Sequence, residues 1–236
     1  MTYRWEWEVF LRDTGGGRTY LDWMLSAWGW TLGVAACSWV IALLLGVVVG
    51  TLRTVPSPWV SRVALGWVEL FRNVPLLVQV FLWYHVVPAF ITPLQQVPSF
   101  VLVVFALGLF TSARIAEQVR AGIQSLSRGQ GLAGLALGLT LPQTYAAVLL
   151  PMALRIVIPP LTSEAMNIVK NSSVAFAVSV GELTLFAMQA QEETSRGVEV
   201  YLAVTALYAF TAFAVNRAMA LIESRTRLPG YVGGQR

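Results

Sequence analysis

The chain has 236 residues, of which 56% are hydrophobic and only 12% are charged, with a formal net charge of +4. Soluble globular domains carry about 25% charged residues, so this composition excludes an ordinary soluble domain and predicts a membrane protein. The basic residues stand singly between apolar blocks, which argues against a nucleic-acid-binding surface and fits cytoplasmic arginines beside membrane spans.

The first predicted spanning helix covers residues 23–52. Before it, residues 1–22 are polar, and Gly15-Gly16-Gly17 predicts a turn. The segment 23–52 carries no charge and exceeds the roughly 20 apolar residues that a bilayer requires. The repeat of Gly46 and Gly50 four residues apart predicts close packing against another helix.

A second helix is predicted over 63–88, after a basic linker that contains Arg53 and Arg62. Pro75 is expected to bend this helix. Glu69 and Arg72 are three residues apart and can pair on one helix face. These charges either lie at the membrane surface or face a polar path through the protein.

A third helix is predicted over 98–123, after an uncharged proline-containing loop. Near its end, Arg114, Glu117 and Arg120 are spaced by three residues. We interpret them as a solvated or interfacial charge stripe.

The stretch 127–151 predicts two short helices joined at Gly138, because a helix end favours a residue that tolerates positive φ. Two capping-box spacings mark their starts: Ser127 with Gln130, and Thr140 with Gln143. Small residues alternate with leucine in the first helix, which predicts a surface that docks on another protein.

Beyond Pro151, we predict a spanning helix over about 154–174 that contains Pro159-Pro160. A shorter apolar piece, about 175–190, need not span, and a last helix begins over 200–216. The transmembrane domain is therefore placed at 23–223, and residues 224–236 form a tail.

Several polar residues fall inside the predicted spans, where they usually face a bundle interior or a water-filled path. The alternative is that they form pairs that only lock helices together. The candidates for a translocation path are Glu69, Arg72, Asn73, Pro75, Gln79, Glu164, Lys170, Asn171 and Ser172.

The distribution of basic residues predicts five spans with the N-terminus outside. This arrangement puts eleven arginines inside and four outside, in agreement with the positive-inside rule. A sixth span over 175–190 would turn the arginine-rich C-terminus outward. The stretch 127–151 is therefore expected in the cytoplasm, between helices three and four.

The sequence gives no reason to expect an enzyme or a metal site. Lys170, the only lysine, follows Val169, so the phosphate-binding pattern G-x-x-x-x-G-K-[ST] is absent. The patterns G-x-S-x-G and H-E-x-x-H are also absent. The lone histidine, His85, has no potential ligand residues grouped with it in the sequence.

With these residues in view, the chain resembles the permeases of ATP-binding-cassette importers, and within them the polar amino acid family, most of all its glutamate/aspartate branch. The family signature E-A-A-x3-G-x9-I-x-L-P is matched in spacing. Its positions here are Leu132, Ala133, Gly134, Gly138, Val148, Leu150 and Pro151. Further similar motifs are VELFRNVPLLVQ, EQVRAGIQSLSRGQ, IPPLTSE and KNSSV.

The resemblance implies an all-α polytopic membrane protein with the type I importer permease fold. It implies a bacterial inner membrane location, with residues 1–22 in the periplasm and the tail 224–236 in the cytoplasm. The implied partners are a second permease subunit or a second copy of this chain, two cytoplasmic ATPase subunits, a periplasmic amino acid-binding protein and membrane lipid. ATP and Mg²⁺ would be bound by the ATPase, and this chain itself would hold no cofactor.

The resemblance also implies a coupling role for the stretch 128–150. The residues expected to contact the ATPase are Leu132, Ala133, Gly134, Leu135, Gly138, Leu150 and Pro151. Leu132 stands where the family usually has an acid, so docking here is expected to rest on apolar packing more than on charge.

Two other classes remain open on the sequence alone. A self-sufficient secondary transporter or channel would need its own ion-coupling site and often shows internal repeats, and no repeat is visible. A structural or assembly subunit of a membrane complex would leave amino acid uptake unchanged when removed.

Overall fold

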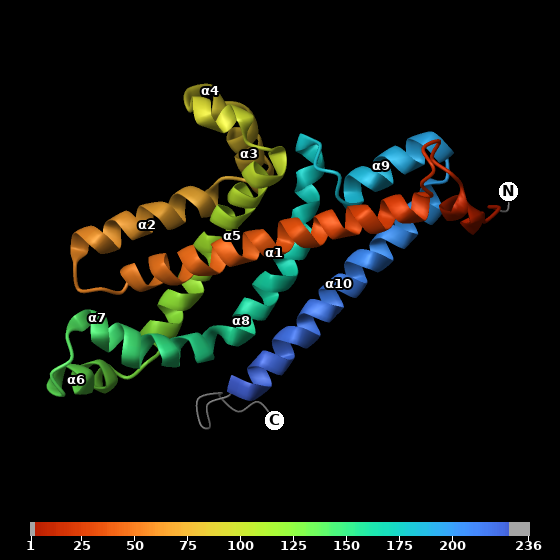
Figure 1. Ribbon diagram of the computed structural model, residues 1–236. Coiled ribbons are helices and arrows are strands. Elements are labelled where there is room, and N and C mark those ends of the chain that lie inside the picture. The colour runs from red at the N-terminus through yellow and green to blue at the C-terminus, as the bar shows by residue number, and fades with distance from the viewer. Residues whose placement is uncertain (1–2, 227–236) are drawn as a thin grey trace. The chain divides into compact units, whose positions relative to one another are not determined.

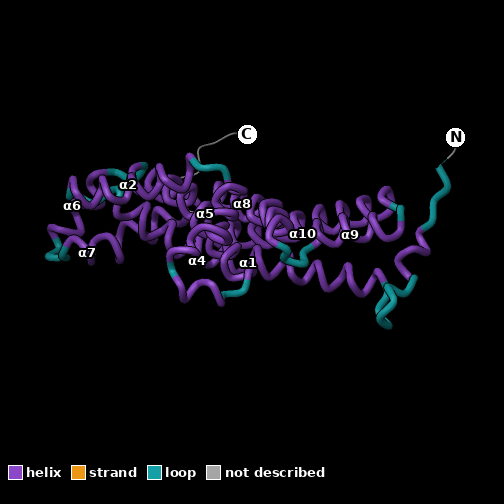
Figure 2. The backbone as a smooth tube through the Cα atoms, turned by 90° about the horizontal axis from the view of Figure 1, so that it is seen from above, coloured by secondary structure: helices purple, strands orange, loops and turns teal. Residues whose placement is uncertain are grey.

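A computed structural model describes residues 3–226, and within that range it consists of helices and connecting loops (Figures 1 and 2). The helices are α1 (Tyr20–Leu52), α2 (Pro58–Asn73), α3 (Leu76–Phe81), α4 (Val87–Phe90), α5 (Ser99–Gln124), α6 (Arg128–Ala136), α7 (Leu141–Thr144), α8 (Leu150–Asn171), α9 (Leu183–Thr194) and α10 (Gly197–Thr226). The last ten residues of the predicted tail, 227–236, lie outside the described residues.

The structure agrees with the prediction of about five spans. Among the described residues, four helical segments are long and apolar enough to cross a membrane, namely α1, α5, Leu141–Val178 and α10. The bent pair of α2 with Leu76–Phe90 is a fifth when its two parts count as one broken span. With 12 residues, α9 is about 18 Å long, too short for a hydrocarbon core of about 30 Å. The expectation that this piece need not span therefore holds.

Two predicted helix bounds were wrong. The second helix begins at Pro58 rather than at 63, because proline at the first helical position loses no intrahelical hydrogen bond. The bend predicted at Pro75 is confirmed, and it takes the form of a break in the helix at Val74–Pro75. The last helix extends over Gly197–Thr226, well beyond 200–216.

The region around Pro151 also differs from the prediction. The second short helix does not end before the span, because α7 continues through a π-helical turn at Tyr145–Leu149 directly into α8. Pro159 and Pro160 lie inside α8, and the helix continues through them.

The described chain forms two compact units, and each of the four long helices contributes a part to both. The first unit comprises Met1–Ser38, Pro75–Leu107 and Asn167–Ala214. The second comprises Trp39–Val74, Gly108–Met166 and Val215–Arg236.

In the first unit, the N-terminal segment packs on α9 and α10. Val9 and Phe10, from a 3₁₀ turn at Trp7–Leu11, are buried in a cluster with residues of α1, α9 and α10. Glu199 is fully buried, and its carboxylate accepts hydrogen bonds from the Tyr3 hydroxyl and the Glu6 backbone N–H. The carboxylate of Glu199 therefore holds the N-terminal segment against α10.

Glu182 caps the N-terminus of α9 in the same unit. Its carboxylate accepts hydrogen bonds from the backbone N–H groups of Thr184 and Leu185 and, at 2.7 Å, from the hydroxyl of Tyr208 in α10. The Thr31 hydroxyl of α1 accepts the Leu183 N–H at 3.1 Å. The side chain of Glu182 is fully buried, and this burial raises its pKa.

In the second unit, glycines let α1 lie close against α5, as the Gly46 and Gly50 spacing predicts. A Cβ on Gly46 would meet the Ile115 side chain at 2.6 Å, and one on Gly50 would meet the Ala116 carbonyl oxygen at 2.6 Å. Val49, Ala64 and Val68 pack beside these contacts in an apolar cluster with α5.

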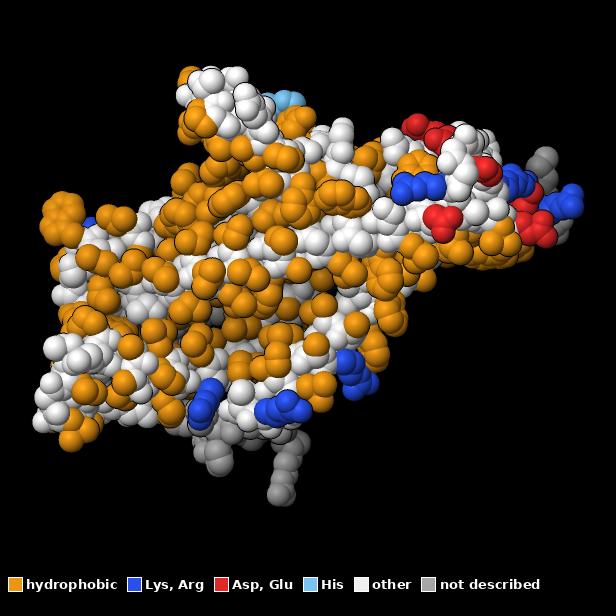
Figure 3. Space-filling model, in the orientation of Figure 1, with side chains coloured by type: hydrophobic (Ala, Val, Ile, Leu, Met, Phe, Trp, Pro, Cys, Tyr) orange, Lys and Arg blue, Asp and Glu red, His pale blue; other side chains and the backbone are white. Residues whose placement is uncertain are grey.

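The surface agrees with a membrane environment. Figure 3 shows hydrophobic side chains over most of the visible face, with acidic side chains gathered where the N-terminal segment and α9 lie. Many large apolar side chains are exposed, such as Val40, Leu44 and Phe210. Such a surface is costly in water and suits lipid or protein partners.

Candidate functional site

The pair α6 and α7 forms a compact turn in the second unit (Figure 1). Gly138 has φ +83°, which confirms the predicted left-handed helix end. The N–H of Leu139 bonds to the carbonyl of Gly134, and the N–H of Gly138 bonds to the carbonyl of Leu135. This Schellman pattern satisfies the last carbonyls of α6 and fixes its angle to α7.

One of the two predicted capping boxes is formed. The side-chain oxygen of Gln143 accepts the Thr140 backbone N–H at 2.8 Å, at the start of α7. The predicted partner box was wrong, because the side chain of Ser127 makes no capping bond. The side-chain oxygen of Gln130 is buried and accepts no hydrogen bond.

The predicted ATPase-contacting residues divide into two groups. Leu132, Ala133 and Leu135 lie on the surface of α6. Gly134 is buried against α7, where a Cβ would meet the Thr144 methyl at 2.8 Å. The first group offers an apolar docking face, whereas Gly134 allows α6 to approach α7.

The exposed face includes one more leucine. Leu137 is 83% exposed, more than Leu132 or Leu135. The helix around it was recognised in the sequence, but its exposure became evident only from the turn at Gly138. Leu150 and Pro151 lie at the start of α8 rather than on α6.

Hydrogen bonds connect this region to the α1–α2 linker. The hydroxyl of Tyr145, in the π-helical turn after α7, donates to the carbonyl of Thr54 at 2.8 Å. The Thr54 hydroxyl in turn donates to the Tyr145 hydroxyl oxygen, at 3.2 Å. This contact has no spacing signal in the sequence, because the partners are 91 residues apart.

Ion pairs connect the same linker to α5. Arg53 pairs with Glu117, and Glu117 also accepts from Arg120 at 2.9 Å. The predicted solvated stripe was therefore wrong for Glu117 and Arg120, which are half-buried. These ion pairs hold the start of the α1–α2 linker against the C-terminal part of α5.

Arg114 makes a two-bond polar contact between α5 and α8. Its guanidinium pairs with Glu164 through two hydrogen bonds, of 2.8 and 2.9 Å, and Gln118 donates to the same carboxylate at 3.2 Å. Bidentate pairs of this kind are directional as well as strong. Glu164, predicted for the translocation path, thus anchors Arg114, whose side chain keeps 43% exposure.

At the end of α2, the predicted pair of Glu69 with Arg72 does not form. Glu69 instead accepts a hydrogen bond from Asn73 at 2.5 Å, one helical turn later. All three side chains are exposed, and Pro75 follows as the N-cap of α3. This exposed polar end fits either a path or a surface.

The remaining candidate path residues belong to the first unit. Gln79 is buried in α3, which contacts the 3₁₀ segment Ser172–Val178. Ser172 is buried and bonds to the carbonyl of Val169, Asn171 is half-buried, and Lys170 is exposed. The structure thus brings α3 to the segment that follows α8, and the path itself stays a prediction.

Family comparison agrees with the resemblance stated from the motifs. Residues 42–228 match the family described as the inner membrane component of binding-protein-dependent transport systems. The chain is 42% identical to the glutamate/aspartate import permease protein GltJ of Escherichia coli K12, and the match covers 100% of both chains. It is 35% identical to the nopaline transport system permease protein NocM of Agrobacterium fabrum C58, over 85% of this chain and 86% of the relative.

Solved structures agree in fold. A crystal structure of an amino acid ABC transporter with histidines has TM-score 0.75 and 29% identity, covering 87% of this chain and 95% of the other. The methionine transporter MetNI has TM-score 0.75 at 20% identity, over 88% and 98%, which indicates a shared fold. This multi-pass membrane chain therefore belongs to the family of inner membrane components of binding-protein-dependent transport systems, the permeases of ATP-binding-cassette importers.

Proposed function

We propose that this permease carries an acidic amino acid, glutamate or aspartate, inward across a bacterial inner membrane. The observation that supports this substrate is the 42% identity, over the whole chain, to a relative named as a glutamate/aspartate import permease. Relatives named for nopaline and for glutamine are less similar, at 35% and 31% identity.

The same proposal includes the family's partners. Two cytoplasmic ATPase subunits supply the energy, a second permease or a second copy of this chain completes the path, and a periplasmic binding protein delivers the substrate. The exposed leucines of α6 are the surface on which an ATPase docks. The alternative of a self-sufficient transporter would leave this apolar face without a role.

The contacts of the second unit supply a mechanism for coupling. Movement of α6 passes to α7 through the Gly134–Thr144 contact and enters α8, because the two helices are continuous. The hydrogen bond of Tyr145 transmits this movement to the α1–α2 linker. The ion pair of Arg53 with Glu117 transmits it from the linker to α5. Nucleotide-driven docking then favours one arrangement of the spans, because its contacts differ between the two states.

Uptake competition tests the substrate. Cells or proteoliposomes that contain this chain with its co-expressed partners take up labelled glutamate in the presence of excess aspartate, glutamine or arginine. We expect aspartate to compete strongly and arginine to compete weakly. Stronger competition by glutamine or arginine than by aspartate contradicts the proposed substrate.

A second experiment tests the dependence on the ATPase. Proteoliposomes that hold the permease without ATPase subunits are expected to show no uptake. Uptake at the full rate without them contradicts the coupling proposal and favours a self-sufficient transporter.

A further inference from the structure

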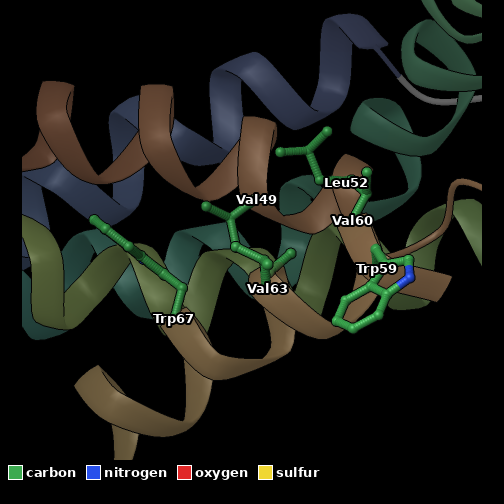
Figure 4. Close-up of a pocket in the computed structure, with 7 residues that line it drawn as sticks. Val49, Leu52, Trp59, Val60, Val63 and Trp67 are labelled. Atoms are coloured by element: carbon green, nitrogen blue, oxygen red, sulfur yellow. The ribbon is translucent and has the colours of Figure 1, made fainter. Parts of the chain in front are cut away.

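An apolar groove lies between the end of α1 and the first half of α2, within the second unit (Figure 4). Its volume is about 430 Å³, within the range of ligand sites. All seven lining residues are apolar, and the six labelled in the figure are Val49, Leu52, Trp59, Val60, Val63 and Trp67.

The lining points to a hydrocarbon chain as the occupant. No lining side chain carries a charge, so a polar solute would lose its hydration in the groove without compensation. The groove is formed by two helices of a membrane-spanning chain, and it is open on one side. Val63 and Trp59 are each 75% exposed, so an acyl chain can enter from the bilayer.

A positive charge lies next to one of the lining residues, Trp59. The Arg62 guanidinium lies 5.7 Å from the centre of the Trp59 ring. Arg62 is exposed and makes none of the ion pairs found in the described part of the chain, whereas Arg53 is already paired with Glu117. Arg62 therefore has donors available for a phosphate at the mouth of the groove.

The start of α2 adds to this positive charge. The N-cap Ser57 makes no side-chain bond to the helix, and the first N–H groups of a helix lack intrahelical partners. Those groups belong to Trp59 and Val60, which also line the groove. The positive end of the 16-residue helix dipole therefore lies at the lining residues Trp59 and Val60.

We propose that this groove binds a phospholipid with an anionic headgroup. One acyl chain lies along the groove lining, and the phosphate is held by Arg62 and the N-terminus of α2. The positive-inside orientation places this end of α1 at the cytoplasmic leaflet, where anionic lipids attract basic residues. The proposal requires only that the chain is embedded in a membrane, and its tests read lipid binding rather than transport.

Lipid retention tests the headgroup. The permease, purified with its co-expressed partners, is incubated with phosphatidylglycerol or phosphatidylcholine, and bound lipid is counted by native mass spectrometry. We expect phosphatidylglycerol to be retained preferentially. Arg62→Gln is expected to weaken this retention about fivefold, the effect of one basic residue near an anionic surface. The control Arg225→Gln, at the end of α10, is expected to change nothing.

Filling the groove tests the acyl chain. Val63→Trp puts a large side chain into the groove, whereas Leu65→Trp adds the same bulk to α2 at a residue that does not line it. We expect only Val63→Trp to abolish the retained lipid. Equal retention by the wild type, Arg62→Gln and Val63→Trp overturns the proposal.

A photoreactive benzophenone residue at Val63 identifies the occupant directly in native membranes. An adduct with phospholipid supports the proposal. An adduct only with another protein chain, such as the second permease subunit, overturns it.

Discussion

Gly138 is the residue whose backbone decides how α6 meets α7. Its φ of +83° lies in the left-handed region, which costs a non-glycine residue about 1–2 kcal/mol. Gly138→Val is expected to disturb the Schellman turn and abolish uptake, while the protein stays in the membrane. Gly131→Val is the matched control, because Gly131 lies in the same helix with open space and without positive φ.

The readouts for Gly138→Val are labelled uptake, membrane abundance by immunoblot, and ATPase stimulation by substrate-loaded binding protein. Normal coupling in Gly138→Val, at equal abundance, contradicts the role of this turn in transmission.

Gly134 acts through packing rather than through backbone conformation. A new Cβ there meets the Thr144 methyl at 2.8 Å, so Gly134→Ala is expected to lower uptake several-fold by separating α6 from α7. Thr144→Ser removes that methyl group and is expected to restore part of the activity in the double variant. If the double variant is as impaired as Gly134→Ala, the contact is not the cause of the loss.

Glu182 makes stability depend on pH. Its pKa is raised by burial, so its stabilising contribution is complete below the ordinary glutamate pKa of about 4.3 and declines as pH rises through the raised value. We expect the melting temperature of the wild type to fall relative to that of Glu182→Gln, which stays neutral throughout. Thermal unfolding of both proteins in detergent from pH 4 to pH 8 measures this difference. If the melting temperature of the wild type stays level with, or rises above, that of Glu182→Gln as the pH increases, the raised pKa of Glu182 does not control stability.

At the scale of elements, the bidentate contact of Arg114 with Glu164 joins α5 to α8. Glu164→Gln keeps the size of the side chain and removes its charge, with an expected loss of about 1–3 kcal/mol in the free energy of unfolding. Glu69→Gln is the control for stability, because Glu69 is exposed and bonds only within α2. Denaturant unfolding of the two variants measures both losses.

A double-mutant cycle with Arg114→Gln measures the interaction energy between Arg114 and Glu164. We expect Glu164→Gln to cost little more once Arg114 is changed. Additive losses would show that the two residues act independently.

The sequence predicted elements better than the contacts between them. Uncharged runs and glycine spacing are local patterns along the chain. The spans, the turn at Gly138 and the packing of Gly46 could therefore be predicted from the sequence. The Arg114–Glu164 pair joins residues 50 apart, and the spacing of Arg114, Glu117 and Arg120 alone favoured a solvated stripe. Thr54 and Tyr145 likewise carried no local signal, because a single hydroxyl contact leaves no periodicity in the sequence.

For the whole molecule, the docking role of α6 requires that Leu137 and the N-terminal turn lie on opposite sides of the membrane. Three spans precede α6 when α2 and Leu76–Phe90 count as one span, and an odd number of spans puts α6 on the side opposite to the N-terminus. The arginine distribution predicts the direction, with eleven of these residues on the inner side and four on the outer side.

Cysteine labelling tests this orientation, because the chain has a single cysteine, Cys37. In a Cys37→Ser background, Gly16→Cys and Leu137→Cys each add one exposed thiol at a position without structural constraint. We expect a membrane-impermeant maleimide to label Gly16→Cys on intact spheroplasts, and Leu137→Cys only after permeabilisation. The reverse pattern would place α6 outside the cell, where no ATP is available, and the coupling role of its exposed leucines would then be untenable.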